Sequence, residues 1–380
     1  MRLTCIAAAR PNFMKVAPIL HAAKKYPGIQ CSLVHTGQHY DERMSDLFFR
    51  ELELPRPDVH LGVGSGSHAA QTARVMLAFD EVLDQQPADM VLVVGDVNST
   101  LACALVAAKR GIPVAHVEAG LRSGDRSMPE EINRILTDQI SDLLFVTERS
   151  AIDNLKGEGC SSERIHFVGN VMIDTLLQHR ERAKQSDILR RLELAPKSYA
   201  VCTFHRPSNV DTEEAAVKTT IALEELLHRL PVVLPIHPRT RARLMEYGLL
   251  ERLQRWTNLH LIEPLGYLDF LALMDGARLL FTDSGGIQEE TTVLGVPCLT
   301  FRDNTERPIT VTEGTNRLIG TDPHRVGAAV DAVLESAKPT GRIPELWDGL
   351  AGERILSILS DWRHSDREIV GAAGGVQLRI

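Results

Sequence analysis

The sequence predicts an α/β protein of two domains, each a doubly wound parallel sheet with helices on both faces. Short apolar runs alternate with longer amphipathic segments along the chain, which is the pattern of parallel βαβ units. The chain has 380 residues, enough to form a core in each of two domains. Its 44% hydrophobic and 24% charged residues are typical of a globular protein.

The apolar runs locate the expected strands and the domain boundary. In the first half we expect strands near residues 2–8, 30–36, 90–95, 113–117 and 142–147, and helices near 13–25, 68–85, 98–110 and 129–140. In the second half we expect strands near residues 165–168, 199–204, 231–236, 258–262, 278–282, 297–301 and 316–319. We expect the boundary near 168–175, with an N-terminal domain at 1–170 and a C-terminal domain at 171–350. Residues 351–380 then form a helix and tail, and this helix can pack back on either domain, with the N-terminal domain as one alternative.

Composition argues against several classes of function. The formal charge of −8 and the lack of a long basic run argue against a nucleic-acid binder. Six scattered cysteines without a C-x-x-C pair indicate reduced core thiols in a cytoplasmic protein. No apolar run approaches about 20 residues, so we expect no membrane span. The segment "GVGSGSH" (62–68) does not follow a strand as a dinucleotide fingerprint would, so we expect no NAD site.

Polar residues follow nearly every predicted strand. Ligands of open parallel sheets bind outside the carboxyl ends of the strands, so these residues are site candidates. The residues at these ends are Arg10, Asp96, Glu118, His205, Arg206, His237, Asp283, Arg302 and Asp303. Lys15 follows Arg10 near the start of a helix, where a cation opposes the helix dipole by about 0.3–1 kcal/mol. It therefore either contacts an anion or points to solvent.

The segment "TDSGGIQEE" (282–290) combines an anion seat with two acids. A glycine turn that enters a helix gathers backbone N–H groups that suit a phosphate. Glu289 and Glu290 follow within the next turn and a half. The pattern favours a ligand with one anionic end and one hydroxyl-rich end.

Two other segments have structural alternatives. In "SMPEEINR" (127–134), Ser127 as N-cap, Pro129 near the first helical position and Glu130 three residues after the cap fit a capping box. His237 lies between two prolines, where a histidine often only satisfies backbone groups. His205 is a stronger candidate because Arg206 beside it suits phosphate recognition.

Eight segments, in this order along the chain, resemble the non-hydrolysing UDP-N-acetylglucosamine 2-epimerases. They are "ARPNFMKVAPI" (9–19), "HTGQHYDERMS" (35–45), "GDVNST" (95–100), "HVEAGLRS" (116–123), "PEEINR" (129–134), "FHRP" (204–207), "TDSGGIQEE" (282–290) and "RDNTERP" (302–308). The resemblance implies two Rossmann-like domains facing a cleft, as in the GT-B type. It also implies a UDP-sugar substrate, a homodimer, and neither a metal nor a nicotinamide cofactor.

The resemblance also implies roles for individual residues. The catalytic residues would be Asp96, Glu118, Glu130 and His205. The substrate-binding residues would be Arg10, Lys15, Arg134, Phe270, Ser284, Gly285, Gly286, Glu290 and Arg307. Among these, Ser284 and Gly286 would hold the pyrophosphate, Glu290 the ribose hydroxyls, and Phe270 would line the uracil pocket. Glu289 receives no role, and we expect it on a solvated helix face.

The implied reaction reverses the configuration at C2 of UDP-N-acetylglucosamine, for surface polysaccharide precursors. Because C2 has no neighbouring carbonyl, its proton is not acidic enough for simple deprotonation. Without NAD, the route is elimination of UDP to 2-acetamidoglucal and re-addition, which requires acid/base groups and a stabilised diphosphate. Alternatives are a 2-epimerase of UDP-2,3-diacetamido-2,3-dideoxyglucuronic acid, a hydrolysing 2-epimerase and a GT-B glycosyltransferase. The cluster of three acids favours an epimerase over a transferase.

Overall fold

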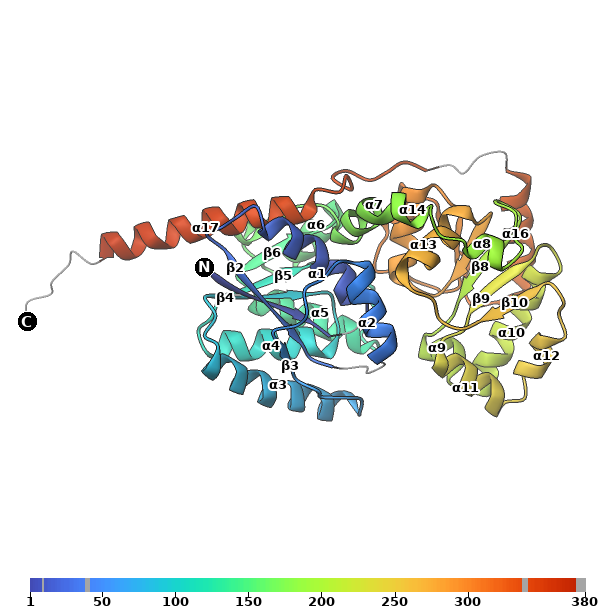
Figure 1. The fold of residues 1–380 in the computed structure, drawn as a ribbon, viewed down its shortest axis with the longest axis horizontal. Coiled ribbons are helices and arrows are strands. Elements are labelled where there is room, and N and C mark those ends of the chain that lie inside the picture. The colour runs from blue at the N-terminus through green and yellow to red at the C-terminus, as the bar shows by residue number, and fades with distance from the viewer. Residues whose placement is uncertain (9, 38–41, 337–340, 374–380) are drawn as a thin grey trace, which may run out of the picture. The chain divides into compact units, whose positions relative to one another are not determined.

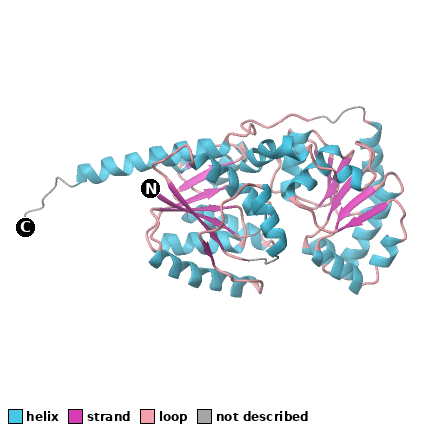
Figure 2. Ribbon diagram, in the orientation of Figure 1, coloured by secondary structure: helices cyan, strands magenta, loops and turns pink. Residues whose placement is uncertain are grey.

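Two compact units form the chain in the computed structural model, which describes residues 1–8, 10–37, 42–336 and 341–373. One unit comprises Met1–Thr175 and Glu345–Ile380, and the other comprises Leu176–Pro344. Each unit contains a sheet whose described strands pair in parallel, with helices on both of its faces (Figure 1, Figure 2). The predicted α/β class of two doubly wound sheets is confirmed.

The sheet of the first unit has seven strands in the order β3-β2-β1-β4-β5-β6-β7. They are β1 (Arg2–Ala7), β2 (Gln30–His35), β3 (Val59–His60), β4 (Met90–Val94), β5 (Val114–Val117), β6 (Leu143–Val146) and β7 (Ile165–Phe167). The order reverses between β1 and β4, which is the point where such sheets bind ligands. The expectation that the strand near 165–168 belongs to the second half is wrong, because β7 pairs with β6. An apolar run shows that a strand forms but not which sheet it joins.

Helices cover both faces of this sheet (Figure 1). They are α1 (Arg10–Ala23), α2 (Glu42–Glu51), α3 (His68–Gln85), α4 (Asn98–Lys109), α5 (Pro129–Ile140), α6 (Arg149–Gly157), the start of α7 (Val171–Ala183), and α17 (Ala351–Ala373), with a 3₁₀ turn at Ser162–Arg164. Helices α3, α4 and α5 pack side by side, and α17 packs against α1. The Asp174 carboxylate accepts hydrogen bonds from the backbone N–H groups of Ala351 (3.1 Å) and Gly352 (2.7 Å), which caps α17.

The sheet of the second unit has six strands in the order β10-β9-β8-β11-β12-β13. They are β8 (Ala200–Thr203), β9 (Val232–Pro235), β10 (Leu259–Ile262), β11 (Leu279–Thr282), β12 (Cys298–Thr300) and β13 (Asn316–Leu318). The helices are α8 (Ile188–Arg191), α9 (Pro207–Val210), α10 (Glu213–Leu227), α11 (Pro238–Glu246), α12 (Leu250–Gln254), α13 (Tyr267–Gly276), α14 (Gly285–Leu294), α15 (Ile309–Thr312) and α16 (Val326–Glu335), with a 3₁₀ turn at Pro323–Arg325. This order repeats that of the first sheet, and it reverses between β8 and β11.

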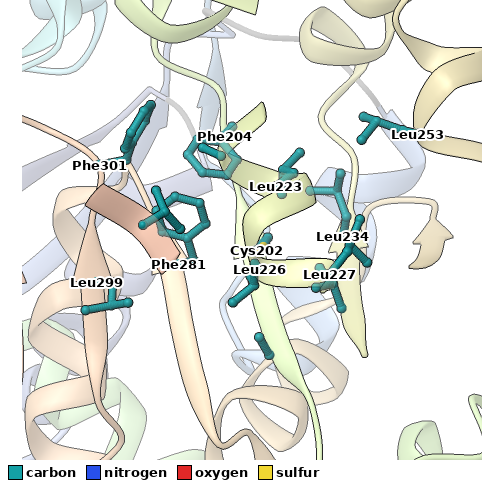
Figure 3. Packing of buried hydrophobic residues seen from close by; sticks show 14 of the residues in the cluster. Cys202, Phe204, Leu223, Leu226, Leu227, Leu234, Leu253, Phe281, Leu299 and Phe301 are labelled. Carbon is teal, nitrogen blue, oxygen red and sulfur yellow. The ribbon is translucent and has the colours of Figure 1, made fainter. Parts of the chain in front are cut away.

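Three phenylalanines form the core behind the carboxyl ends of these strands (Figure 3). Phe204 follows β8, Phe281 lies in β11 and Phe301 follows β12. The ring of Phe204 lies 5.0 Å from that of Phe281 and 6.1 Å from that of Phe301, in edge-to-face arrangements. This packing fixes the backbone from which the polar residues of the next section project.

The six cysteines are free, and all except the partly buried Cys31 are buried, so the prediction of core thiols is confirmed. Among the residues that the structure describes, no helix combines the length and the apolar character that crossing a membrane requires.

Candidate active site

Two neighbouring strands of the first unit, β4 and β5, end beside each other, and β4 borders the reversal point of the sheet. Val94 of β4 pairs with Val117 of β5, so Asp96 and Glu118 emerge from adjacent strand ends. Glu118 has a φ of 70°, a left-handed conformation that is costly for a side chain other than glycine. The surrounding contacts therefore hold Glu118 in place, as expected at a functional site.

Lys15 of α1 forms an ion pair with the Glu118 carboxylate, and the two side chains are only 8% and 2% exposed. Of the two alternatives for Lys15, contact with an anion is confirmed, and the anion is a protein carboxylate. Gly95 makes room for this pair, because a Cβ at Gly95 would lie 2.9 Å from the Lys15 Nζ atom. A buried pair of this kind keeps a charged carboxylate in a site that excludes water.

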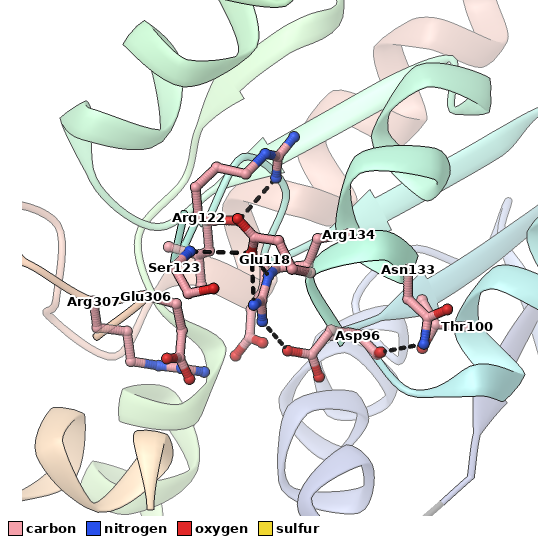
Figure 4. A network of polar contacts seen from close by, with 12 residues as sticks. Asp96, Thr100, Glu118, Arg122, Ser123, Asn133, Arg134, Glu306 and Arg307 are labelled. Atoms are coloured by element: carbon pink, nitrogen blue, oxygen red, sulfur yellow. Dashed lines mark hydrogen bonds and ion pairs between the residues drawn. The ribbon is translucent and has the colours of Figure 1, made fainter. Parts of the chain in front are cut away.

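Arg134 of α5 holds Asp96, the other acid at these strand ends. Its guanidinium donates to the Asp96 carboxylate and, at 2.7 Å, to Glu131, while Asn133 donates to the Asp96 backbone carbonyl at 2.9 Å (Figure 4). Arg134 and Glu131 are each 2% exposed. Asp96 is thus positioned by helix α5 through both its side chain and its backbone.

Glu130 differs from the other acids, and the predicted capping box is wrong. Helix α5 begins at Pro129 with Met128 at its N-cap, which places Glu131 and not Glu130 at the third helical position. Glu131 accepts hydrogen bonds from the backbone N–H groups of Ser123 and Gly124, whereas Ser127 bonds to Asp125. Glu130 is half-buried, and its carboxylate has no hydrogen bond or ion pair with any residue that the structure describes. It is therefore available to a ligand.

In the second unit, β8 and β11 end side by side because Thr203 pairs with Thr282. The Asp283 carboxylate accepts hydrogen bonds from the backbone N–H groups of His205 and Arg206, and it lies 3.1 Å from the His205 Nδ1 atom. Burial acts to raise the pKa of Asp283, but His205 and the other donors more than offset it, so the pKa lies below its usual value. The His205 side chain is 47% exposed. His237 is the N-cap of α11 and accepts from the backbone of Arg239, so its predicted backbone role is confirmed.

The expected anion seat is the start of α14. Ser284 is its N-cap, and the Ser284 hydroxyl makes no capping bond to the helix. Gly285 is required because a Cβ there would lie 2.5 Å from the Arg307 Nη1 atom and 2.7 Å from Glu306 Oε1. Gly286 continues the same first turn. Free N–H groups at a helix start, with a guanidinium beside them, suit a phosphate.

Three guanidinium groups surround the buried Glu306 carboxylate, which sequence reasoning missed. They belong to Arg307 (2.6 Å), Arg302 (2.8 Å) and Arg206 (3.2 Å). Burial acts to raise the pKa of Glu306, but these cations more than offset it and hold the pKa well below its usual value. The three arginines outnumber Glu306 and the neighbouring Glu289 by one, which favours an anionic ligand nearby.

The expectation of a solvated Glu289 is wrong. Glu289 is 1% exposed, and its Oε1 atom lies 2.9 Å from Arg307 Nε. Glu290 is also buried and accepts a hydrogen bond from the Tyr267 hydroxyl. Phe270 is half-buried on the same helix as Tyr267. Nearly all of α14 is buried, so polar residues on this helix do not mark a solvent face.

The structure describes the backbone of Arg10 at the start of α1, but the Arg10 side chain lies outside the described residues. Within the described ranges, no three His, Cys, Asp or Glu side chains group in a way that could hold a metal ion.

A cavity of about 620 Å³ lies elsewhere in the second unit, next to the residues that precede β8, β11 and β12. Its cations already have partners: Lys197 donates to the carbonyls of Asp275 and Ala277, and Arg180 pairs with Asp275. We therefore assign the site to the opposite, carboxyl ends of the strands.

Comparisons with known proteins identify the family of the chain. A family model described as UDP-N-acetylglucosamine 2-epimerase matches residues 21–360. The UDP-N-acetylglucosamine 2-epimerase of Methanocaldococcus jannaschii is 43% identical over 365 residues, which cover 95% of this chain and 99% of the relative. The UDP-2,3-diacetamido-2,3-dideoxy-D-glucuronate 2-epimerase of Pseudomonas aeruginosa is 42% identical over 342 residues, which cover 89% and 92%.

Solved structures give the same result. A structure of the M. jannaschii UDP-GlcNAc 2-epimerase in complex with UDP-GlcNAc and UDP has a TM-score of 0.87 and 42% identity, covering 95% of this chain and 99% of that one. A structure of the Neisseria meningitidis UDP-GlcNAc 2-epimerase bound to UDP-GlcNAc has a TM-score of 0.86 and 29% identity, covering 95% and 100%. The chain therefore belongs to the UDP-N-acetylglucosamine 2-epimerase family.

Proposed function

We propose that the protein interconverts UDP-N-acetylglucosamine and UDP-N-acetylmannosamine for surface polysaccharide precursors. The observation that carries this proposal is the set of acids in the first unit, where Asp96 and Glu118 emerge from adjacent strand ends and Glu130 has no partner among the residues that the structure describes. A transferase needs one base, whereas inversion at C2 needs proton transfer on both faces of the carbon. The relatives named for this activity, and their structures with UDP-GlcNAc, support the choice of substrate.

The proposed reaction eliminates UDP and adds it back. One carboxylate removes the proton from C2 while the bond between C1 and the phosphate oxygen breaks, which gives 2-acetamidoglucal and UDP. A proton then returns to the opposite face of C2 as UDP attacks C1. Asp96, Glu118 and Glu130 supply the acid and base groups, and His205 with Arg307 stabilises the departing diphosphate.

The remaining residues bind the substrate. The start of α14 at Ser284, Gly285 and Gly286 holds the pyrophosphate, and Glu290 accepts hydrogen bonds from the ribose hydroxyls. Phe270 lines the uracil pocket, and Arg10 adds a cation beside the phosphates. Lys15 and Arg134 hold the acids Glu118 and Asp96 in the geometry that proton transfer requires.

Incubation with UDP-N-acetylglucosamine in D₂O, followed by NMR of the products, tests the function. We expect UDP-N-acetylmannosamine with deuterium at C2 and no free sugar, without added NAD or acceptor and in the presence of EDTA. Free N-acetylmannosamine would indicate a hydrolase, and an unchanged substrate would indicate a transferase. A product that retains hydrogen at C2 would contradict the elimination route. Parallel incubation with UDP-2,3-diacetamido-2,3-dideoxyglucuronic acid decides between the two sugars.

We also propose a homodimer in the cytoplasm. Leu77 on α3 and Ile132 and Leu136 on α5 are 70%, 42% and 46% exposed; both helices pack against α4, and large exposed apolar groups of this kind favour a protein contact. The free cysteines favour a reducing compartment. Light scattering of the parent and of Leu77→Glu tests the dimer, which we expect to weaken in the variant; a monomeric parent would contradict it.

A further inference from the structure

A buried histidine and aspartate connect the three segments that carry the candidate acids of the first unit. His116 lies in β5, two residues before Glu118, and Asp138 lies in α5, the helix of Glu130. The His116 Nδ1 atom is 2.7 Å from Asp138 Oδ1, and neither side chain is exposed to solvent. The other ring nitrogen, Nε2, is 2.8 Å from the backbone carbonyl of Gly95, which precedes Asp96.

The Asp138 carboxylate also reaches the residues that follow Glu118. Its Oδ2 atom accepts a hydrogen bond from the backbone N–H of Gly120 at 3.0 Å and pairs with Arg122 at 2.7 Å. Glu118 therefore has a fixed neighbour on each side, His116 before it and Gly120 after it, and both contact the same carboxylate. This arrangement can hold Glu118 in its left-handed conformation.

The hydrogen-bond partners assign hydrogens to both nitrogens of the His116 ring. A backbone carbonyl only accepts hydrogen bonds, so Nε2 must donate to Gly95. Burial acts to raise the pKa of Asp138, but His116 and Arg122 more than offset it, so the pKa lies below its usual value and the group is an acceptor carboxylate. Nδ1 therefore donates to Asp138. The ring therefore forms two fixed bonds, and the one to the charged Asp138 carboxylate is the stronger kind.

We propose that His116 and Asp138 are positioning residues for the epimerase reaction: the buried pair fixes the backbone of Gly95–Asp96, the turn after Glu118 and helix α5 in one geometry. The inference rests on the proposed function. The pair acts through the acids and does not touch the substrate. Its value to the reaction is precision, because a displacement of about 1 Å in a reacting group can lower the rate by about 10².

Variants of the pair separate positioning from stability and from nucleotide binding. His116→Leu removes both hydrogen bonds, His116→Gln can still donate to the Gly95 carbonyl, and Asp138→Asn removes the negative charge. We expect kcat to fall about 10²-fold in His116→Leu and to recover about tenfold in His116→Gln. We expect KM for the UDP-sugar and Kd for UDP to stay within about threefold of the parent, since the residues proposed to bind the nucleotide, other than Arg10, lie in the other unit.

His166 offers a matched control on the same sheet. It lies in β7, the edge strand beside β6, is half-buried, and its ring packs near that of Phe145 in β6. We expect the kcat of His166→Leu to stay within about twofold of the parent. Thermal unfolding shows which variants are folded, and kcat is compared with that of the parent only for those variants. If His116→Leu does not fold, the kcat values of His116→Gln and Asp138→Asn are compared with that of the parent instead.

Two outcomes would overturn the proposal: a folded His116→Leu or Asp138→Asn with kcat within about twofold of the parent, or a loss of UDP affinity equal to the loss of kcat. A parent that does not epimerise UDP-N-acetylglucosamine would instead refute the proposed function. ¹⁵N NMR of the His116 ring tests the two hydrogen bonds directly, independently of any activity measurement. We expect a hydrogen on each ring nitrogen where it faces its acceptor, and a nitrogen without a hydrogen facing Gly95 or Asp138 would refute the assigned bonds.

Discussion

The Tyr267 hydroxyl donates a hydrogen bond of 3.0 Å to the Glu290 carboxylate, and the two side chains are 2% and 3% exposed. Burial raises the pKa of Glu290 to about 8, although the bond from Tyr267 acts in the opposite direction. At neutral pH, Glu290 is therefore largely a neutral acid. Glu290 is proposed to accept hydrogen bonds from the ribose hydroxyls. Before UDP binds, it is mostly the neutral carboxylic acid, which accepts hydrogen bonds less strongly than the carboxylate does.

This relationship predicts that UDP binding depends on pH. Ribose hydroxyls that donate to Glu290 favour its ionised form, so UDP binding releases a proton and tightens as pH rises through about 8. We expect the Kd of UDP to fall about fivefold to tenfold between pH 7 and pH 9 by calorimetry. Glu290→Gln should bind UDP more weakly and lack this dependence. A parent and variant with the same pH profile would contradict the ribose assignment.

The same pKa predicts the effect of Glu290 on stability. The folded-state pKa is above the usual value of 4.5, so the contribution of Glu290 to stability is full below about 4.5 and is lost as pH rises through about 8. We expect Glu290→Gln to raise the thermal unfolding temperature relative to the parent more at pH 9 than at pH 6. An equal difference at both values would show that burial does not penalise the charged form.

The Lys15–Glu118 pair predicts a large and specific loss of stability. Lys15→Met leaves the Glu118 carboxylate buried without its cation, which costs about 3–5 kcal/mol in comparable buried pairs. Lys15→Met with Glu118→Leu should recover much of that loss while remaining inactive. Urea unfolding of the three proteins measures both effects.

The exposed pair Lys25–Glu353 is the control for this experiment. Its side chains are 65% and 46% exposed, so Lys25→Met should change the free energy of unfolding by less than about 1 kcal/mol. Similar losses for Lys15→Met and Lys25→Met would show that burial of the first pair carries no penalty.

We expect the substitution Gly285→Ala to impair nucleotide binding only. Gly285→Ala places a Cβ within 2.5 Å of Arg307 Nη1 and 2.7 Å of Glu306 Oε1, so these groups must move from the start of α14. We expect the Kd for UDP to rise about tenfold or more, as the loss of a charged hydrogen bond does. Gly157→Ala is the control, because a Cβ at Gly157 meets nothing within 4 Å. Unchanged UDP affinity in Gly285→Ala would place the pyrophosphate elsewhere.

The sequence predicted the described strands other than β3 (Val59–His60), and the residues at their carboxyl ends, because both depend on local patterns; β3 is too short to give such a pattern. Apolar runs followed by Asp96, Glu118, His205 and Asp283 mark the strand ends directly. The sheet to which β7 belongs depends on β6, which no local pattern encodes. Glu289 was placed in solvent because polarity normally marks an exposed face, whereas α14 is buried almost all round and Arg307 neutralises Glu289.

Long-range pairs were the main omission. His116 and Asp138 are 22 residues apart, and three arginines reach Glu306 from two separate segments. One available signal was that His116 lies two residues before Glu118, a spacing that places side chains on one face of a strand. The predicted capping box failed because Ser127 and Glu130 have the right spacing one residue out of register with the helix that forms.

His205 provides the most direct test of how the diphosphate is stabilised. Its Nδ1 atom lies 3.1 Å from the carboxylate of Asp283, and the ring is 47% exposed, so Nε2 is left to face a ligand. His205→Asn keeps a donor near the position of Nδ1 and removes Nε2. We expect kcat to fall about 10²–10³-fold, because losing one well-placed electrostatic group costs about this much, with a smaller effect on UDP affinity.

His237→Asn is the matched control. The ring of His237 is 6.1 Å from that of His205, but His237 caps α11 through Nδ1, a role that asparagine can also fill. Equal losses in the two variants would show that the region needs both rings for packing, and His205 would no longer be the group that stabilises the departing diphosphate.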